Sequence, residues 1–325
     1  MGNPMASLKT YSHLPAGRRP TDYEIGSTRL HHHVERGFEV RVPAAEWYQR
    51  HQRGSRWQAA DWELFADPRE TTYAGYTALQ RDQEAFCDGL LANIDGSSYD
   101  RDLPPEARAL LEGAVLPLRF VGHGLQMLAA YVGQMAPSGR ITIAALFQAA
   151  DEVRRIHRLA YRMAQLRATE PLFGEDGRAR FERDACWQPL RRLIEALMVT
   201  WDWAEAFVAL NVCVKPILDE LILVELGAAG RARGDFALGQ LLGAFAEDAR
   251  WHRRWTEALV RVALAARPEN GQAYGDWVQA WLPRASEAAR GMAPLMGPAG
   301  DAAVEAALTR AAAFRAALTA PGGSP

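Results

Sequence analysis

The chain has 325 residues, of which 49% are hydrophobic and 23% are charged, and its formal net charge is −2. This composition is typical of a globular protein long enough to bury one large core, and it lacks the basic excess that binding to nucleic acid or to an anionic membrane would need. The three cysteines, Cys87, Cys186 and Cys213, are far apart and share no Cys-x-x-Cys spacing. They predict buried thiols in a reducing cytoplasm rather than a disulfide framework or a zinc site.

Residues 1–68 show no sustained hydrophobic period and are interrupted by prolines. They nevertheless carry eight aromatic side chains: Tyr11, Tyr23, Phe38, Trp47, Tyr48, Trp57, Trp62 and Phe65. Disordered segments are poor in aromatic residues, so we expect an extended N-terminal arm that lies against another surface, which includes that of a partner chain. Within the arm, a short helix is expected over 44–51. The arm has no apolar run of signal-peptide length.

From residue 69 onward, apolar residues recur every three or four positions, which is the period of amphipathic helices. We predict helices over 73–94, 104–135 with a kink at Pro117, 141–169, 187–196, 235–266, 274–291 and 299–318. The helix from 187 is expected to continue through 201–207 to 227 with a bend at Pro216, and Pro268 is expected to end the helix before it. No segment alternates like a strand. The uncharged stretch 120–139 contains four glycines, which is poor material for a membrane span. Long helices joined by short turns predict an all-α, antiparallel bundle over 69–325, with accessory helices at the C-terminus.

Two of the predicted helices carry an almost complete di-iron motif. The segments Ala-Asp-Glu-Val-Arg-Arg at 150–155 and Ala-Glu-Asp-Ala-Arg-Trp at 246–251 resemble the frame that holds the Glu-x-x-His ligand pairs of ferritin-like monooxygenases. A di-iron bundle needs two such pairs and one glutamate from each of two other helices. Here Arg155 and Trp251 stand at the two imidazole positions. The frames therefore favour a ferritin-like fold and argue against the metal chemistry.

The spacing of the remaining histidines can be tested at about 100° per residue. Glu152 and His157 are five residues apart and point in different directions, so they cannot hold one metal ion. Asp248 and His252 are four residues apart and could share one, although the other helix offers no matching imidazole.

Carboxylates persist at the other bundle positions, where Glu84 and Glu205 could face inward beside Glu152 and Asp248. Buried acids without a metal need compensating cations. We therefore hypothesise that Arg155 and these carboxylates form a buried network in the place that iron occupies in the related fold. The alternative is that Glu84 and Glu205 are unrelated surface acids.

Several uncommon strings identify a family. The following strings occur in order: Tyr-Ser-His-Leu at 11–14, Pro-Thr-Asp-Tyr-Glu-Ile at 20–25, the segment 80–86, Tyr-Val-Gly-Gln-Met-Ala-Pro at 131–137, Phe-Val-Ala-Leu-Asn at 207–211 with Val-Lys-Pro at 214–216, and the segment 248–255. Together they resemble the β subunit of the hydroxylases of bacterial multicomponent di-iron monooxygenases, within the toluene, phenol and alkene group. The resemblance covers about residues 8–290.

This resemblance implies a ferritin-like subunit without catalytic or cofactor-binding residues, in which Glu84, Glu152, Arg155, Glu205, Asp248 and Trp251 are degenerate ligand positions. The di-iron centre is expected in a partner α subunit, and the assembly in an (αβγ)2 hydroxylase. An effector protein, a Rieske ferredoxin and a reductase would complete a system that oxidises small hydrocarbons with O2 and electrons from NADH.

Two other functions remain open at this stage. A self-sufficient metal oxidase or oxygenase would use Glu84, Glu152 and Glu205 together with Asp248 and His252, and it predicts bound iron or manganese in the isolated chain. An unrelated helical scaffold or binder of apolar ligands would also have long helices and an aromatic arm, and it predicts no oxygenase partner.

Overall fold

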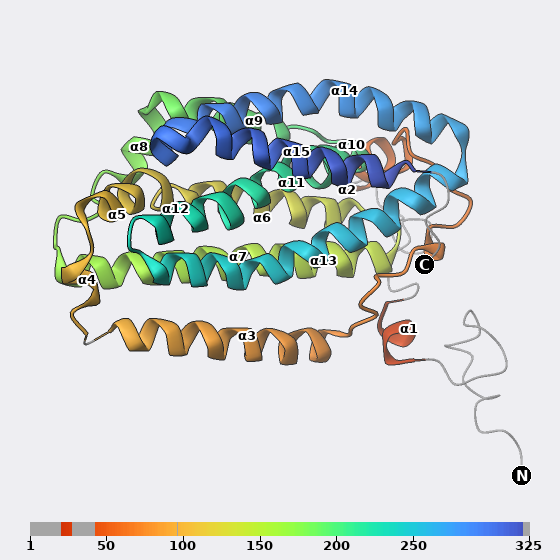
Figure 1. Ribbon diagram of the computed structural model, residues 1–325. Helices are drawn as coiled ribbons and strands as arrows, with labels where there is room; N and C mark the ends of the chain where they lie inside the picture. Colours follow the sequence, from red (N-terminus) through yellow and green to blue (C-terminus); the bar gives the residue numbers. More distant parts are fainter. Residues whose placement is uncertain (1–20, 28–42, 96, 321–325) are drawn as a thin grey trace, which may run out of the picture.

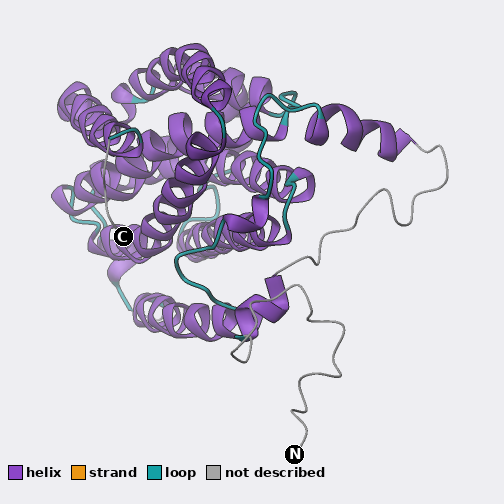
Figure 2. Ribbon diagram, turned by 90° about the vertical axis from the view of Figure 1, so that its right-hand side faces the viewer, coloured by secondary structure: helices purple, strands orange, loops and turns teal. Residues whose placement is uncertain are grey.

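The computed structural model describes residues 21–27, 43–95 and 97–320, and every regular element in these ranges is a helix (Figure 2). The α-helices are α1 (Asp22–Ser27), α2 (Pro43–Tyr48), α3 (Tyr73–Ile94), α4 (Tyr99–Asp102), α5 (Pro105–Leu110), α6 (Leu118–Met135), α7 (Gly139–Thr169), α8 (Gly177–Arg183), α9 (Gln188–Leu197), α10 (Trp203–Phe207), α11 (Lys215–Asp219), α12 (Gly227–Ala232), α13 (Phe236–Ala266), α14 (Pro268–Gly291) and α15 (Gly300–Leu318). The prediction of an all-α bundle of long helices is confirmed (Figure 1). No helix of the described ranges is both long enough and apolar enough to cross a lipid bilayer.

The two central helices α6 and α7 are joined by a tight turn and pack closely along their length (Figure 1). Ser138 begins α7, because its hydroxyl accepts a hydrogen bond from the backbone N–H of Arg140 at 3.1 Å. Gly133 lies where α6 approaches α7. A Cβ atom at this position would lie 3.2 Å from Cβ of Ala145, so the glycine permits the close contact.

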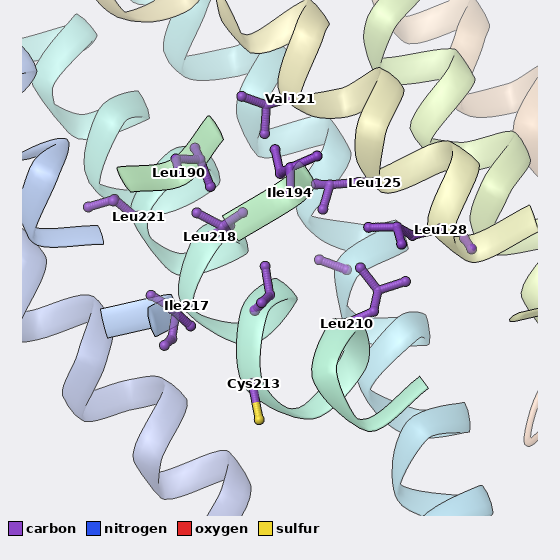
Figure 3. Close-up of a cluster of buried hydrophobic side chains, with 14 of the residues drawn as sticks. Val121, Leu125, Leu128, Leu190, Ile194, Leu210, Cys213, Ile217, Leu218 and Leu221 are labelled. Atoms are coloured by element: carbon purple, nitrogen blue, oxygen red, sulfur yellow. The ribbon is translucent and has the colours of Figure 1, made fainter. Parts of the chain in front are cut away.

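One continuous hydrophobic core fills the bundle. Figure 3 shows part of it, where side chains of α6, α9 and the segment 210–221 meet in the interior. Val121 and Leu125 come from α6, Ile194 from α9, and Leu218 from α11, and all are buried. At about 25 cal/mol per Å² of apolar surface, this burial is the main term that holds the helices together.

The described end of the N-terminal arm packs on the helical body. Trp57 is buried against Trp203 and Trp277, with ring centroids 6.2 and 5.9 Å away, and its Nε1–H donates to the carbonyl of Asn270 at 3.1 Å. Other aromatic residues of the arm, such as Tyr11 and Phe38, lie outside the described residues. The division into an arm over 1–68 and a body over 69–325 stays a prediction.

Two boundaries differ from the prediction. The helix from Gln188 does not continue to 227, because the chain turns after Leu197 and Asp202 starts a new helix by accepting the N–H groups of Ala204 and Glu205. The next helix was predicted to start at 274, but it starts directly at Pro268. Proline is favoured at the first position of a helix because its missing N–H has no partner there in any case. A third difference is that the helix predicted over 104–135 is divided by a π-helical turn over Leu111–Val115 and a turn at 116–117.

Candidate functional site

A group of buried ionisable side chains lies between α3, α7, α11 and α13. We call it the ionic cluster, and it consists of Asp151, Glu152, Arg154, Arg155, Lys215, Asp219 and Asp248. All seven are less than 9% exposed. Burial of so many charges is costly unless they are paired and hydrogen-bonded, so the pairing pattern decides what the cluster can do.

The local sequence explains why Lys215 and Asp219 point inward. They are four residues apart on α11, so they share one helix face. Two π-helical segments, Val208–Val214 and Glu220–Leu226, flank this short helix. A π-helical turn shifts the face that the following residues present, and it lets an otherwise apolar stretch direct two charges into the bundle.

One half of the ionic cluster is a four-membered ion-pair group. Nη1 of Arg155 lies 3.1 Å from both Oε1 of Glu152 and Oδ1 of Asp219. Nζ of Lys215 lies 2.5 Å from the same oxygen of Glu152 and 3.2 Å from the same oxygen of Asp219. Burial alone would raise the pKa of both acids, but Arg155 and Lys215 lower the pKa of Glu152 and bring that of Asp219 to about 2. Both carboxylates are therefore ionised.

The other half surrounds Asp151. Its Oδ1 accepts hydrogen bonds from the hydroxyl of Tyr76 at 2.6 Å and from Nε2 of Gln80 at 2.7 Å, and its Oδ2 lies 2.9 Å from Nε2 of His252. Burial raises the pKa of Asp151 to about 6. Burial, together with the charges of Lys215 and Arg155, lowers the pKa of His252 well below its ordinary value. His252 is therefore a neutral partner of Asp151.

Asp248 is joined to α7 and to α3. It forms an ion pair with Nη2 of Arg154 and accepts a hydrogen bond from Nε2 of Gln80 at 3.0 Å. Burial and the nearby charge of Asp151 raise the pKa of Asp248. Nη1 of Arg154 also lies 3.1 Å from Oε1 of Glu84, so the predicted position Glu84 does face the cluster. The amide nitrogen of Gln80 therefore donates hydrogen bonds to the carboxylates of both Asp151 and Asp248.

Trp251 stands apart from the ionic cluster. The guanidinium carbon of Arg69 lies 5.4 Å from the centroid of the indole ring, and that of Arg254 lies 4.7 Å from it. Such contacts favour a cation over an aromatic face. The ring is half-buried, and it is held by these two cations.

Glu205 is not part of the network, which corrects the hypothesis that it faces the other acids. Its Oε1 accepts the indole N–H of Trp281 at 2.9 Å. The reason is the new helix start at Asp202, which gives Glu205 a place in the first turn of α10. Asp219 on α11 supplies the carboxylate of the Arg155 group instead.

The arrangement does not fit a di-iron centre. The acids that could serve as ligands are engaged by Arg154, Arg155 and Lys215, so a divalent ion would have to displace these buried cations from their carboxylate partners. No group of three or more His, Cys, Asp or Glu side chains suited to a metal ion occurs within the described ranges. Chemically, the cluster can connect helices and hold protons at Asp151.

Sequence reasoning missed six members of this site: Tyr76, Gln80, Asp151, Arg154, Lys215 and Asp219. A signal existed for two of them. Lys215 and Asp219 are charges four residues apart in the mostly apolar segment 206–224, and charges in such a segment are rarely buried unless paired. Arg154 could not be predicted from spacing, because it and Arg155 are neighbours in the segment 150–155 and the spacing does not show which of the two contacts Asp248.

Comparison with known proteins gives a consistent result. The model of the family described as Methane/Phenol/Alkene Hydroxylase matches residues 47–267. The β subunit of the hydroxylase component of the toluene-4-monooxygenase system of Ectopseudomonas mendocina is 33% identical over 290 residues, which are 87% of this chain and 88% of that protein. The small subunit of the propane 2-monooxygenase hydroxylase component of Mycolicibacterium goodii is 27% identical over 258 residues, or 76% of this chain and 69% of that one.

Solved structures agree on the fold. A chain of toluene 4-monooxygenase, solved with toluene bound in the resting active site, superposes with a TM-score of 0.84 and 31% identity over 91% of this chain and 99% of that chain. A chain of the xenon-pressurised phenol hydroxylase of Pseudomonas sp. OX1 gives a TM-score of 0.85 at 19% identity, over 95% and 93% of the two chains. At that identity the second likeness concerns the fold alone.

Proposed function

This chain belongs to the methane/phenol/alkene hydroxylase family, and we propose that it is the β subunit of the hydroxylase of a multicomponent di-iron monooxygenase. Its relatives are β or small subunits of such hydroxylase components. The chain is thus part of an oxidoreductase, and its own role is structural.

The observation that carries the structural role is the position of Arg155. Its guanidinium lies between Glu152 and Asp219, with Lys215 on the same two carboxylate oxygens. Cations of the protein thereby neutralise the middle of the bundle, which is where a ferritin-like di-iron protein places its metals. We therefore assign the di-iron centre to a partner α subunit, and we assign no catalytic, metal or cofactor residue to this chain.

We assign the partners accordingly. The chain joins α and γ subunits in an (αβγ)2 hydroxylase that oxidises small hydrocarbons such as aromatic compounds and alkenes with O2. An effector protein, a Rieske ferredoxin and an NADH-dependent reductase serve the assembly in the cytoplasm. The helical body over 69–325 scaffolds α, and the arm over 1–68, whose described end packs on this body, contacts α as well.

The outer face of α3 supports contact with a partner. This helix lies at the lower edge of the bundle in Figure 1. Leu79 and Phe86, seven residues apart and hence on one side of it, are each 50% exposed. Apolar side chains that gather on one exposed face are typical of protein interfaces.

Co-expression tests the proposal. The chain should be produced alone and together with a candidate α and γ pair, and metal content and mass should be measured by elemental analysis and light scattering. We expect a metal-free chain alone, and a stable heterohexamer that contains iron only when α is present. Stoichiometric iron in the isolated chain would overturn the proposal and would make Asp248 and His252 the first residues to substitute.

A further inference from the structure

A small cavity lies beside the ionic cluster, between α6, α7, α13 and the segment that contains α11. Its volume is about 40 Å³. Most of its wall is apolar and includes Val121 and Leu125 of α6, Leu218 of α11, and Leu242 and Phe245 of α13. Figure 3 shows Val121 and Leu125 of α6 and Leu218 of α11 approaching the same interior region.

Glu152, Arg155 and Asp219 form one edge of this cavity. Arg155 and Lys215 engage one oxygen of each acid, and Nη2 of Arg155 donates to the carbonyl of Phe245 at 3.1 Å. Nε of Arg155 has no hydrogen-bond partner within the protein. A water molecule needs two to four polar partners, so we expect water at this ionic edge and not among the leucines.

The size of the cavity limits its occupant. A volume of about 40 Å³ is roughly three times the minimum for one water molecule, and it is far below the volume of about 150 Å³ that accommodates benzene. Toluene or phenol therefore does not fit. A smaller apolar molecule gains dispersion contacts with the surrounding side chains, and it forfeits no hydrogen bonds on leaving water.

The cavity reaches the protein surface at three half-buried residues that form its rim. Gly122, Ile156 and Ile222 line the cavity and are each partly exposed, whereas the other lining residues are buried. A Cβ atom at residue 122 would lie 2.9 Å from Cγ1 of Ile156. The glycine therefore leaves room for Ile156 at the rim.

We propose that the apolar part of this cavity binds one molecule of about one to three heavy atoms without hydrogen-bonding groups, the size class of dioxygen and xenon. Nothing in the function proposed above requires this site, and the site can exist whether or not that function is correct.

Xenon is the probe of choice because its anomalous scattering identifies it. Crystals of the full chain, or of its hydroxylase assembly, should be pressurised with xenon and compared with untreated crystals. We expect a xenon peak between Val121, Leu125 and Leu218. Absence of a peak there, or water density among these side chains that xenon does not displace, would overturn the proposal.

Two variants distinguish the loss of cavity volume from an unspecific change in the packing of α6. Val121→Ile adds one methylene group into the cavity and is expected to lower xenon occupancy about threefold or more, because the occupant loses its space. Val132→Ile adds the same group on the same helix at an equally buried residue that does not line the cavity, and it should leave occupancy unchanged. Equal occupancy in both variants would contradict the assignment of the site.

Discussion

Asp151 and His252 lie on facing helices with Oδ2 of the one 2.9 Å from Nε2 of the other. The pKa of Asp151 is raised to about 6 by burial, while that of His252 is lowered well below 6.5. The two groups therefore affect stability in opposite directions over the same pH range. Between pH 7 and pH 5, folded Asp151 takes up more protons than it does in the unfolded chain, and folded His252 takes up fewer.

We first predict the effect of removing the histidine. The unfolded imidazole binds a proton as the pH falls through 6.5 and the folded one does not, so acidification lowers the contribution of His252 to the free energy of unfolding. His252→Gln removes this loss. The unfolding free energy of the variant minus that of the parent chain should therefore be about 2 kcal/mol larger at pH 5 than at pH 7. Urea unfolding of both proteins at the two pH values measures this difference.

Asp151→Asn is predicted to behave in the opposite way. Because folded Asp151 binds its proton more tightly than the unfolded residue, acidification raises its contribution to stability, and the substitution removes that gain. The unfolding free energy of this variant minus that of the parent chain should be about 1 kcal/mol smaller at pH 5 than at pH 7. If both variants shift in the same direction with pH, the assigned protonation states are wrong.

Arg155→Met is predicted to destabilise the chain strongly. It leaves Glu152 and Asp219 buried, and Lys215 is then the one cation of the described residues that forms an ion pair with them. Loss of one partner from a buried ion-pair group typically costs about 3–5 kcal/mol. Arg261→Met is the control, because its pair with Glu257 is exposed and should cost less than about 1 kcal/mol. Equal unfolding free energies of the two variants would argue against the ionic cluster.

The fold and the site were not equally predictable from sequence. The boundaries of α3, α7 and α13 lie within two residues of the ranges predicted from apolar periodicity, which is a local feature. The hypothesis of a buried network around Arg155 named Glu152 among four acids, and Glu152 does pair with Arg155, three residues away on the same helix.

Asp219 and Glu205 show where such reasoning fails. Which carboxylate meets Arg155 depends on how α11 is rotated between two π-helical segments, and on the break at Asp202 that moves Glu205 toward Trp281. The rotation of α11 depends on packing between residues far apart in the sequence, whereas the break at Asp202 is a helix start that Asp202 itself caps. Helical spacing alone does not encode them.

A double substitution tests whether the charges act as a group. Removing Glu152 together with Arg155, as Glu152→Gln/Arg155→Met, leaves Lys215 and Asp219 as a matched pair 3.2 Å apart. Replacement of a whole buried pair is often close to neutral. We expect the double variant to recover about 2 kcal/mol or more of the stability that Arg155→Met loses, and residues in direct contact commonly show coupling of about this size. Additive losses in the unfolding free energies would mean that Glu152 and Arg155 contribute independently.

The exposed face of α3 gives the last prediction. Phe86→Glu places a charge on a side chain that is 50% exposed in the single chain, so the fold of the chain itself should change little. If this face contacts the α subunit, the charge loses its hydration at the interface, and association should weaken by about 2 kcal/mol or more.

Leu172→Glu is a matched control, because Leu172 is 74% exposed and lies outside α3. The measurement is the fraction of heterohexamer after co-expression, with circular dichroism to verify the fold. Normal assembly of the Phe86 variant would show that α docks elsewhere, and it would leave the assignment as a β subunit intact.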